Sequence, residues 1–525
     1  MLKSPRFVVA LLVAPILLAL FPIAVMAQGD LVGDGVVEDG GSAAIAELLD
    51  PIVRRRGGRI GVAVYAADLG NSLYLHNADL PLTPASNMKL YTTAAALDRL
   101  GPDFQYTTSV YADGEIHPDG TLDGDLILIG RGDPTLSGRF HGDSVTFVFD
   151  RFAARLKRMG IRRVTGAVVG DATYLDDTRI APGWDSTNLL RWYGARSSAL
   201  SFNDNVVTIE IRPGGWVGAP PALTFYPHTD RLEISNQAVT VGRRGGRSIG
   251  IRRQPETGDY LIRGRIPLRS RPLRYMVSVE DPALYTTSVF ADRLRRVGIE
   301  VEGGERVVHR WQREGARSGT LLVSHTSPRM SDIVKIVNKR SQNFFAEQLL
   351  KTLGAVFKAD GSFASGAEVV YDVLEGLGLE TDGLTIEDGS GLSRLNLLTA
   401  RRTAELLVAM RAHPLFDEFY ESLAIAGEDG DPRRLDAPAA RGNVHSKTGT
   451  LRGVSALSGY VTTSDGELLV FSILINNLPR GKSAAMSIED AIVERLAEFS
   501  RWHPPLSCAT GSSTPNGVEG CLPEG

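Results

Sequence analysis

A serine and a lysine stand three positions apart at Ser86 and Lys89. On an α-helix three residues advance about 4.5 Å along the axis and about 300° around it, so these two side chains can meet on one face. Pro84 disfavours helix at the residue before it and Gly101 provides a stop, so the sequence predicts a helix that begins near Ser86. A serine there has a free N–H for a developing oxyanion. The pair predicts a nucleophile with an amine beside it, and the alternative is a helix cap followed by a solvated lysine.

A second lysine stands in the triplet Lys447-Thr448-Gly449. Ser-x-x-Lys is expected about once by chance in a chain of this length, whereas Lys-Thr-Gly is expected only about a tenth of a time, so the triplet is the stronger signal. Its neighbours predict a strand with Lys447 and Gly449 on one side and Thr448 on the other, able to pair with an extended peptide. The alternative is an ordinary turn with an exposed lysine.

The pattern Ser-x-Asn occurs three times, beginning at Ser186, Ser201 and Ser341. The last copy precedes an amphipathic helix and lies outside the β-rich middle of the chain. We therefore select Ser341 and Asn343, with loop capping as the alternative.

A serine hydroxyl needs a base, and Lys89 is the nearest candidate. An unperturbed lysine titrates near ~10.4, so a base at neutral pH requires a pKa lowered by about three units. Burial and the like charge of Lys447 can supply that shift. Ser390, in the loop Asp388-Gly389-Ser390-Gly391, is predicted to line the same cleft, with a glycine-rich turn as the alternative.

The length and composition of the chain limit the classes of function that it can have. The chain has 525 residues, enough for two or three domains, and its net charge of −4 gives no case for a nucleic-acid partner. Lys3 and Arg6 precede an apolar run that ends at Val25-Met26-Ala27, which predicts a signal peptide cleaved after Ala27 and export to the periplasm or cell envelope. The rival is an uncleaved anchor, but Pro15, Pro22 and the small residues at the exit favour cleavage, and we expect membrane contact to be peripheral at most.

Two cysteines, Cys508 and Cys521, stand in a Pro/Gly/Ser-rich tail and are expected to form a local disulfide. No metal site or cofactor is expected. The Gly-x-Ser-x-Gly pattern at Gly246 lies among arginines and is interpreted as a hairpin, and His445 as a strand residue.

Hydrophobic periodicity predicts the elements around these motifs. Helices are expected over 43–53, 90–97, 144–159, 284–297 and 484–501, and strands over 59–67, 72–76, 122–129, 166–171, 206–211, 444–448, 455–462 and 468–476. The two N-terminal and three C-terminal strands predict one five-stranded antiparallel sheet with helices on both faces. The sequence between them, about 105–324, is predicted to be a semi-independent appendage.

The order Ser-x-x-Lys, Ser-x-Asn, Lys-Thr-Gly resembles that of the penicillin-recognising serine acyltransferases. The chain is most similar to one branch, the low-molecular-mass class C penicillin-binding proteins, which are D-alanyl-D-alanine carboxypeptidases/endopeptidases of the S13 peptidase type. Further residues that carry this resemblance are 130–136 (GRGDPTL), 198–205 (SALSFNDN) and 388–393 (DGSGLS). The interval of roughly 250 residues between Ser86 and Ser341 also fits a branch with two inserted domains.

The resemblance implies an α/β penicillin-binding-protein/β-lactamase-like fold with two inserted β-rich domains. The expected ranges are 28–104 and 325–502 for the penicillin-binding domain, 105–202 and 280–324 for the first insert, 203–279 for a small β module, and 503–525 for the tail. It further implies an exported serine D,D-peptidase that acts on peptidoglycan stem peptides and cross-links and is acylated by β-lactams.

The resemblance also implies the role of each residue. Ser86 is the nucleophile, Lys89 the base and Ser341 the proton relay. Asn343 holds a substrate amide and Lys89. Lys447 and Thr448, with Gly449 behind them, bind the substrate carboxylate, and the N–H groups of Ser86 and Thr450 form the oxyanion hole. Two rival functions remain: a β-lactamase or esterase, which requires a dedicated glutamate for deacylation, and a non-catalytic wall-binding sensor.

Overall fold

The computed structural model describes residues 40–54, 58–228, 233–254, 260–310, 319–429, 434–479 and 481–501. They all fall within one unit of the chain, Val36–Gly525. The predicted signal segment and the two tail cysteines lie outside the described residues. Within the described ranges, no helix combines the length and the apolar character that a membrane crossing needs.

The central sheet is antiparallel, with strand order β16-β17-β18-β19-β1-β2. Its strands are β1 (Arg59–Ala66), β2 (Ser72–His76), β16 (Ala424–Ile425), β17 (His445–Leu451), β18 (Val454–Thr462) and β19 (Leu468–Asn476). The sheet has one strand more than predicted, because Ala424 and Ile425 pair with the first two residues of β17. A strand of two residues is too short to show the alternating hydrophobic pattern by which strands are predicted from a sequence.

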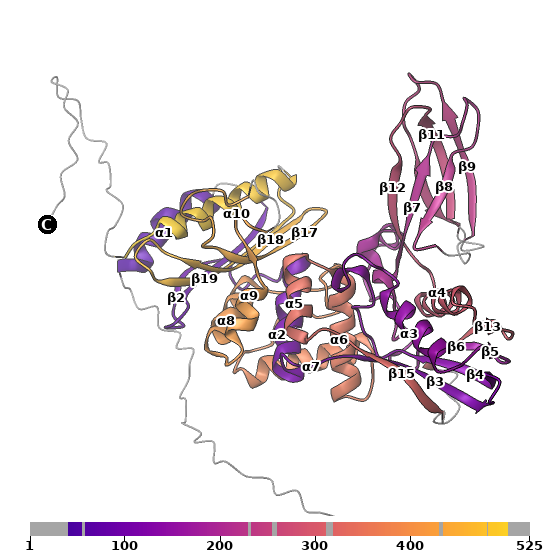
Figure 1. Cartoon of the computed structure of the whole chain (residues 1–525). Helices are drawn as coiled ribbons and strands as arrows, with labels where there is room; N and C mark the ends of the chain where they lie inside the picture. The colour runs from indigo at the N-terminus through magenta and orange to yellow at the C-terminus, as the bar shows by residue number, and fades with distance from the viewer. Residues whose placement is uncertain are drawn as a thin grey trace, which may run out of the picture. The chain divides into compact units, whose positions relative to one another are not determined.

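Helices cover both faces of this sheet (Figure 1). One face carries α1 (Gly40–Val53) and α10 (Gly481–Glu498), and the other carries α2 (Met88–Leu100), α5 (Met330–Lys339), α6 (Asn343–Phe357), α7 (Phe363–Gly376), α8 (Ala400–Ala412) and α9 (Phe416–Ser422). Along β1, Val62 and Val64 lie in the core beneath α1 and α10, whereas Ala63 and Tyr65 lie in the core on the opposite face of the sheet. Successive side chains of a strand point to opposite faces, so burial on both faces explains the continuous apolar strands.

The first insert is a mixed sheet with two helices. Its strands are β3 (Thr107–Ile116), β4 (Thr121–Ile129), β5 (Arg163–Val164), β6 (Val168–Asp171), β13 (Glu300–Val301), β14 (Glu305–Val308) and β15 (Thr320–Thr326), and its helices are α3 (Phe147–Arg158) and α4 (Pro282–Arg296). β4 runs antiparallel to β3 and parallel to β6. The two helices share a core with β3, β4 and β6.

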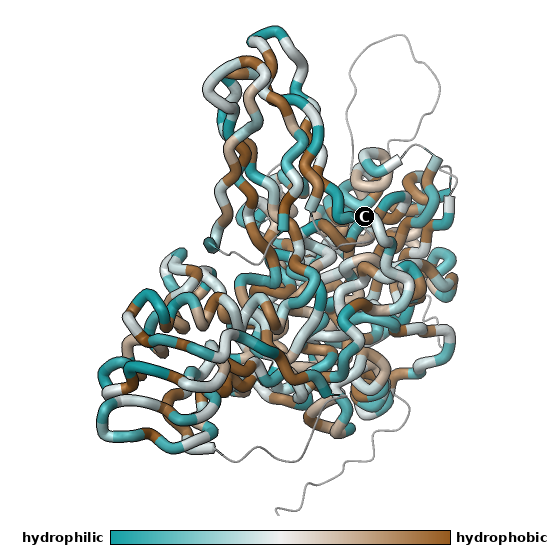
Figure 2. Tube along the Cα trace, turned by 90° about the vertical axis from the view of Figure 1, so that its right-hand side faces the viewer, coloured by the Kyte–Doolittle hydropathy of each residue, from teal (hydrophilic) through white to brown (hydrophobic). Residues whose placement is uncertain are grey.

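The nested module consists of two three-stranded sheets. One is β12-β7-β8 and the other β10-β11-β9. Their bounds are β7 (Val206–Arg212), β8 (Ala222–Tyr226), β9 (Ile234–Val241), β10 (Gly250–Arg253), β11 (Tyr260–Pro267) and β12 (Leu273–Ser278). Hydrophobic and hydrophilic residues alternate along these strands (Figure 2), and the inward set forms a separate core. Val206 and Ser278 are register partners, so the module begins and ends at the same place.

Candidate active site

The predicted nucleophile lies in a single 3₁₀ turn, Ala85–Asn87, that leads directly into α2. The Asn87 side chain ties this turn to the sheet, because its Nδ2 donates to the Lys447 carbonyl at 2.7 Å and its Oδ1 accepts from Ser458 Oγ at 2.9 Å. The start of α2 is thereby held against β17 and β18, and Ser86 comes to lie beside the Lys-Thr-Gly strand.

Lys89 reaches back from the first turn of α2 to the serine. Its Nζ donates to Ser86 Oγ at 3.0 Å, to Asn343 Oδ1 at 2.7 Å and to the Ser390 carbonyl at 2.6 Å. Lys89 is fully buried. Three acceptors match the three N–H donors of an ammonium group, so the amine is fixed in direction as well as in position.

Burial lowers the pKa of Lys89 to about 7, while the charges of Glu347 and Asp388 act in the opposite direction. From the sequence, we expected burial and the like charge of Lys447 to lower the pKa of Lys89 together. The structure makes burial the largest downward influence and places two carboxyl groups nearby that limit it. The like charge is felt at Lys447, whose pKa lies well below its usual range because of burial and, secondarily, Lys89.

Glu347, one turn after Asn343 on α6, belongs to the site although no sequence motif contains it. It is fully buried, and its Oε2 accepts from the Gly389 N–H at 2.8 Å and its Oε1 from the Ser390 N–H at 3.0 Å. Burial and the charge of Asp388 raise the pKa of Glu347 to about 8, whereas its hydrogen bonds with Ser390 and Gly389 and the charge of Lys89 act to lower it. Both oxygens accept N–H bonds, so the loop favours the ionised form and partly offsets the effect of burial.

Asp388 organises the rest of the same loop. Its carboxylate accepts from the N–H groups of Gly391 (2.7 Å) and Ser393 (2.6 Å) and from Trp184 Nε1 (2.8 Å). Gly391 has φ +80°, and a Cβ there would lie 1.7 Å from the Ala85 carbonyl oxygen. The glycine therefore allows the loop to pack directly against the turn that carries the nucleophile.

The structure gives Ser390 a different position from the predicted one. Its side chain is fully buried and its Oγ accepts from the Leu392 N–H at 3.2 Å. The residue acts through its backbone, whose N–H meets Glu347 and whose carbonyl meets Lys89. It therefore positions Lys89 and does not line an open surface.

The residues of β17 alternate between the two sides of the strand, as predicted. Lys447 and Gly449 are buried, whereas Thr448 and Thr450 are exposed. Lys447 Nζ donates to Ser341 Oγ at 2.9 Å and to the Thr448 carbonyl at 2.9 Å. A Cβ on Gly449 would lie 3.0 Å from the Ser86 nitrogen, so the glycine keeps the strand close to the proposed oxyanion donor.

Two residues beside the reacting groups have backbone angles that are uncommon outside glycine. Ala85, directly before the nucleophile, has φ 48°, and Ser341 has φ 52°. Such conformations cost of order 1–3 kcal/mol and concentrate where the surroundings determine a functional geometry.

The first insert supplies direct partners to the site. Asn343 Nδ2 donates to the Tyr193 carbonyl at 2.8 Å, and Trp184 binds Asp388 as described above. Elsewhere on α6, Gln348 Nε2 donates to the carbonyls of Gly132 (3.0 Å) and Ser198 (2.8 Å). These last two residues belong to the segments that carried the family resemblance, which now have a structural role in docking the insert.

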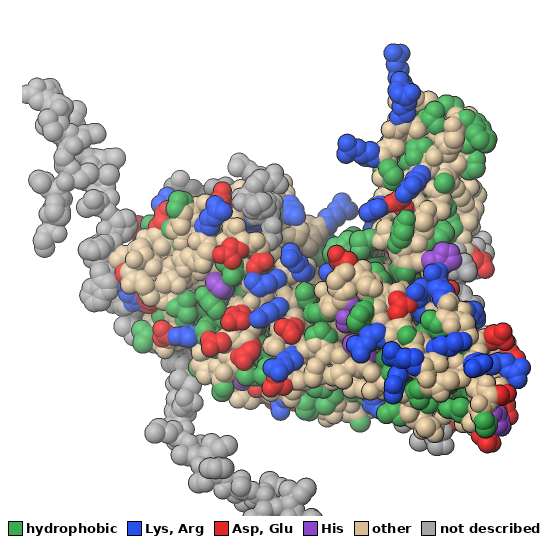
Figure 3. Space-filling view, in the orientation of Figure 1, with side chains coloured by type: hydrophobic (Ala, Val, Ile, Leu, Met, Phe, Trp, Pro, Cys, Tyr) green, Lys and Arg blue, Asp and Glu red, His purple; other side chains and the backbone are tan. Residues whose placement is uncertain are grey.

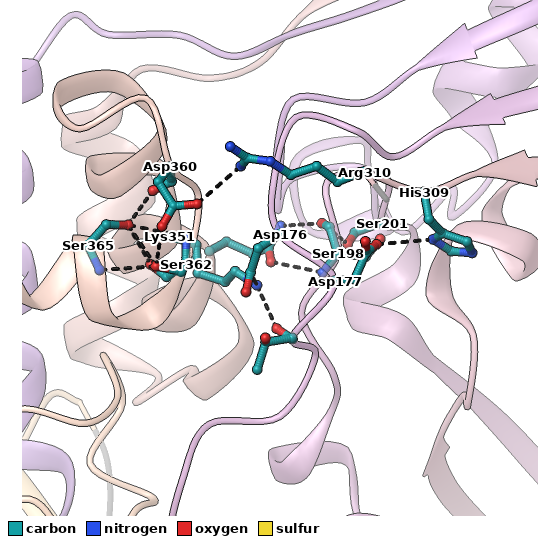
Figure 4. A network of polar contacts seen from close by, with 12 residues as sticks. Asp176, Asp177, Ser198, Ser201, His309, Arg310, Lys351, Asp360, Ser362 and Ser365 are labelled. Atoms are coloured by element: carbon teal, nitrogen blue, oxygen red, sulfur yellow. Dashed lines mark hydrogen bonds and ion pairs between the residues drawn. The ribbon is translucent and has the colours of Figure 1, made fainter. Parts of the chain in front are cut away.

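A buried lysine extends this contact. Lys351 Nζ lies 2.5 Å from Asp176 Oδ1 and donates to the Thr178 carbonyl at 2.6 Å, while Arg310 pairs with Asp360 at 3.3 Å (Figure 4). The first insert is thus joined to α6 by buried polar contacts that the interpretation of residues 105–324 as a semi-independent appendage did not include. Its polar groups satisfy buried side chains of α6, which a hydrophobic pattern could not reveal.

The remaining sequence motifs lie apart from this cluster. Ser186 lies in a short 3₁₀ turn, and Ser201 Oγ donates to the Ser198 carbonyl, both within the insert. The Ser248 N–H of the Gly-x-Ser-x-Gly pattern donates to the Arg265 carbonyl, in the nested module. His445 stacks on the Tyr420 ring at 3.9 Å, as expected of a strand residue.

An antiparallel sheet between helical layers, with a serine–lysine pair where a buried helix meets its Lys-Thr-Gly strand, defines the penicillin-recognising serine enzymes. The crystal structure of penicillin binding protein 4 (dacB) from Haemophilus influenzae has this fold: it superposes with a TM-score of 0.75 and 24% identity, covering 87% of this chain and 99% of that one. A D-alanyl-D-alanine carboxypeptidase of an Actinomadura species is 35% identical over 476 residues, 88% of this chain and 85% of its own length.

D-alanyl-D-alanine carboxypeptidase DacB of Haemophilus influenzae is 26% identical over 412 residues, 77% of this chain and 83% of its own length. Residues 42–499 match the D-Ala-D-Ala carboxypeptidase 3 (S13) family. The chain belongs to this family and is a serine-type D,D-peptidase.

Proposed function

We propose that this D,D-peptidase cleaves D-alanyl-D-alanine termini and D-alanyl cross-links of peptidoglycan through an acyl-enzyme on Ser86. The observation that carries the proposal is the hydrogen bond of 3.0 Å between Lys89 Nζ and Ser86 Oγ. It joins a nucleophile to a buried amine whose pKa is lowered to about 7. A wall-binding protein without catalysis has no need of that pair.

In the acylation step, the neutral Lys89 amine takes the Ser86 proton as the serine oxygen attacks the carbonyl carbon of the scissile amide. The N–H groups of Ser86 and Thr450 stabilise the resulting oxyanion. The proton then passes from Lys89 through Ser341 Oγ, which accepts from Lys447 Nζ, to the leaving amine as the C–N bond breaks, so that Lys89 is neutral again. Water then hydrolyses the ester and regenerates the serine.

Lys447 and Thr448 recognise the carboxylate beside the scissile bond. β16 pairs only with His445 and Ser446, so none of the described strands covers the rest of that edge of β17. An extended substrate can add there as a further strand. A β-lactam presents a carboxylate and a strained amide to the same groups.

Glu347 bears on the rival β-lactamase function. A glutamate that drives deacylation must reach a water molecule beside the ester, whereas Glu347 is fully buried and its two oxygens are held by the N–H groups of Gly389 and Ser390. We therefore infer a long-lived adduct with β-lactams. A crystal structure of the Haemophilus influenzae protein complexed with a novel beta-lactam supports binding of this ligand class.

Export to the cell envelope, with cleavage near Ala27, completes the proposal, because peptidoglycan lies outside the cytoplasm. The experiment compares wild type with Ser86→Ala for release of D-alanine from a D-alanyl-D-alanine peptide and for cleavage of a cross-linked muropeptide. Wild type should perform both reactions and the folded variant neither. Undiminished release of D-alanine by the variant would overturn the mechanism.

A further inference from the structure

The nested module differs in charge from the rest of the chain. Residues 203–279 contain twelve arginines, no lysine and six acidic residues, whereas the whole chain has a net charge of −4. Several of these arginines are paired: Arg212 and Arg274 share the buried carboxylate of Glu210, at 2.6 and 2.7 Å. Five of the others stand in the loops at one end of the module.

That end is formed by the three loops between successive strand pairs, residues 213–221, 242–249 and 268–272. The loops adjoin one another through β9, because the Gly218 N–H donates to the Thr240 carbonyl and the Leu268 N–H to the Val241 carbonyl. They lie opposite the strand ends Val206 and Ser278, where the module joins the rest of the chain. Lys and Arg side chains project from the module in Figure 3.

Five arginines and no acidic residue occur in these loops: Arg243, Arg244, Arg247, Arg269 and Arg271. All five are exposed, and the described part of the chain offers none of them an ion pair within 4 Å. We name these five residues, with Trp216 and Val217, the arginine tip.

Trp216 and Val217 are the apolar part of the tip. Their side chains are 68% and 58% exposed, on the first of the three loops. Tryptophan is enriched at bilayer–water interfaces because its indole has both an apolar body and an N–H donor. Arginines on the same surface can pair with lipid phosphates there.

We propose that the arginine tip docks the enzyme on an anionic lipid bilayer. A dissolved polyanion would neutralise the arginines but leave the adjacent Trp216 and Val217 in water, whereas an anionic bilayer satisfies both. The docking is peripheral, since only loops at the end of the module enter the interface. The active site lies beyond the other end of the module, so docking leaves its residues untouched.

The test measures cosedimentation of the full-length protein with vesicles of phosphatidylcholine alone and of phosphatidylcholine with phosphatidylglycerol, at a ratio of about 7:3. Binding should require the anionic lipid and weaken as salt rises from about 0.1 to about 0.5 M. Each arginine contributes about fivefold to binding, so R243Q/R244Q/R247Q should lose about 100-fold. Trp216→Ala should lose about tenfold.

The matched control is R155Q/R158Q/R162Q, which removes three exposed arginines of the first insert for which the described residues supply no ion pair. This variant should bind vesicles like wild type, and all variants should hydrolyse a soluble thioester at the wild-type rate, which shows that they are folded. Equal binding to neutral vesicles, or equal losses in both triple variants, would overturn the proposal. Binding of soluble polyphosphate as tight as that of vesicles, with no effect of Trp216→Ala, would replace the bilayer by a dissolved polyanion.

Discussion

The two lysines of the active site are both buried, yet their surroundings differ. Lys89, on α2, donates to an amide oxygen, a carbonyl and the nucleophile, and feels the charges of Glu347 and Asp388. Lys447, on β17, donates to two acceptors among the described residues, Ser341 Oγ and a carbonyl of its own strand. No carboxylate of the described chain forms an ion pair with it, and its one resolved charged influence is Lys89.

The difference separates two tasks. Nearby carboxyl groups keep the pKa of Lys89 from falling further, which suits a group that must take up and return a proton near neutral pH. A buried cation without a counter-ion is unfavourable until an anion arrives, which suits a group that selects substrates with a carboxylate. The first four predictions below test this division, beginning with the largest expected effect, and the fifth tests what the inserted sequence contributes.

Lys89→Ala should lower the acylation rate by about 10⁴-fold, because it removes the base and leaves the serine hydroxyl protonated. Stopped-flow labelling with a fluorescent penicillin measures this rate, and thermal unfolding provides the control for folding. A loss of less than tenfold would assign the base role to another group.

Lys447→Ala should reduce kcat/KM for a D-alanyl-D-alanine peptide and a cross-linked muropeptide by roughly 2–4 kcal/mol, as expected when a charge-assisted contact is left unmade. A thioester that lacks the carboxylate should lose much less, because it never made that contact. Equal losses on all three substrates would mean that Lys447 acts on the chemistry, and the division of tasks would be withdrawn.

The pH profile of the wild type should rise with the fraction of neutral Lys89. With the pKa of Lys89 at about 7, the rate at pH 5 should be about 100-fold below that at pH 9. Because the pKa of Lys447 is also lowered, the rate for substrates with a carboxylate should fall at a pH below the ordinary lysine range, whereas the carboxylate-free thioester should show no such fall. A rate that climbs steadily to pH ~10 would contradict a depressed lysine.

Glu347→Gln should reduce kcat/KM by about 10–100-fold, since one of the two loop N–H groups loses its acceptor. The glutamate charge stabilises the protonated form of Lys89, so its removal should also move the rising limb of the pH profile to lower pH. Glu405→Gln, which changes a buried glutamate on α8 away from the site, is the control and should leave the limb in place. An unmoved limb in Glu347→Gln would show that this carboxyl group does not tune Lys89.

Replacement of residues 207–277 by a short Gly-Ser turn should leave hydrolysis of a soluble substrate within about twofold of wild type, because the module ends are register partners. Deletion of 105–320 should instead abolish acylation, since Asn343, Asp388, Gln348 and Lys351 would lose buried partners. Retained acylation by the larger deletion would restore the interpretation of the insert as an appendage.

The lysines themselves could be located from the sequence because each belongs to a motif with a fixed spacing. Glu347 and Asp388 could not, since an isolated acidic residue has no spacing that distinguishes a buried carboxyl group from a solvated one. The same limit applies to Asn87 and Trp184, whose partners lie hundreds of positions away. The long strands were predictable from their apolar runs, while β16 depends on pairing alone.

The central claim is that Ser86 forms the covalent intermediate, and mapping a penicillin adduct tests it most directly. Trypsin should release residues 60–89 as one peptide that contains Ser72 and Ser86, and fragmentation distinguishes them. The account predicts the added mass on Ser86 in the wild type and no adduct in Ser86→Ala. An adduct on Ser72, Ser341 or Ser390 would contradict the assignment of the nucleophile.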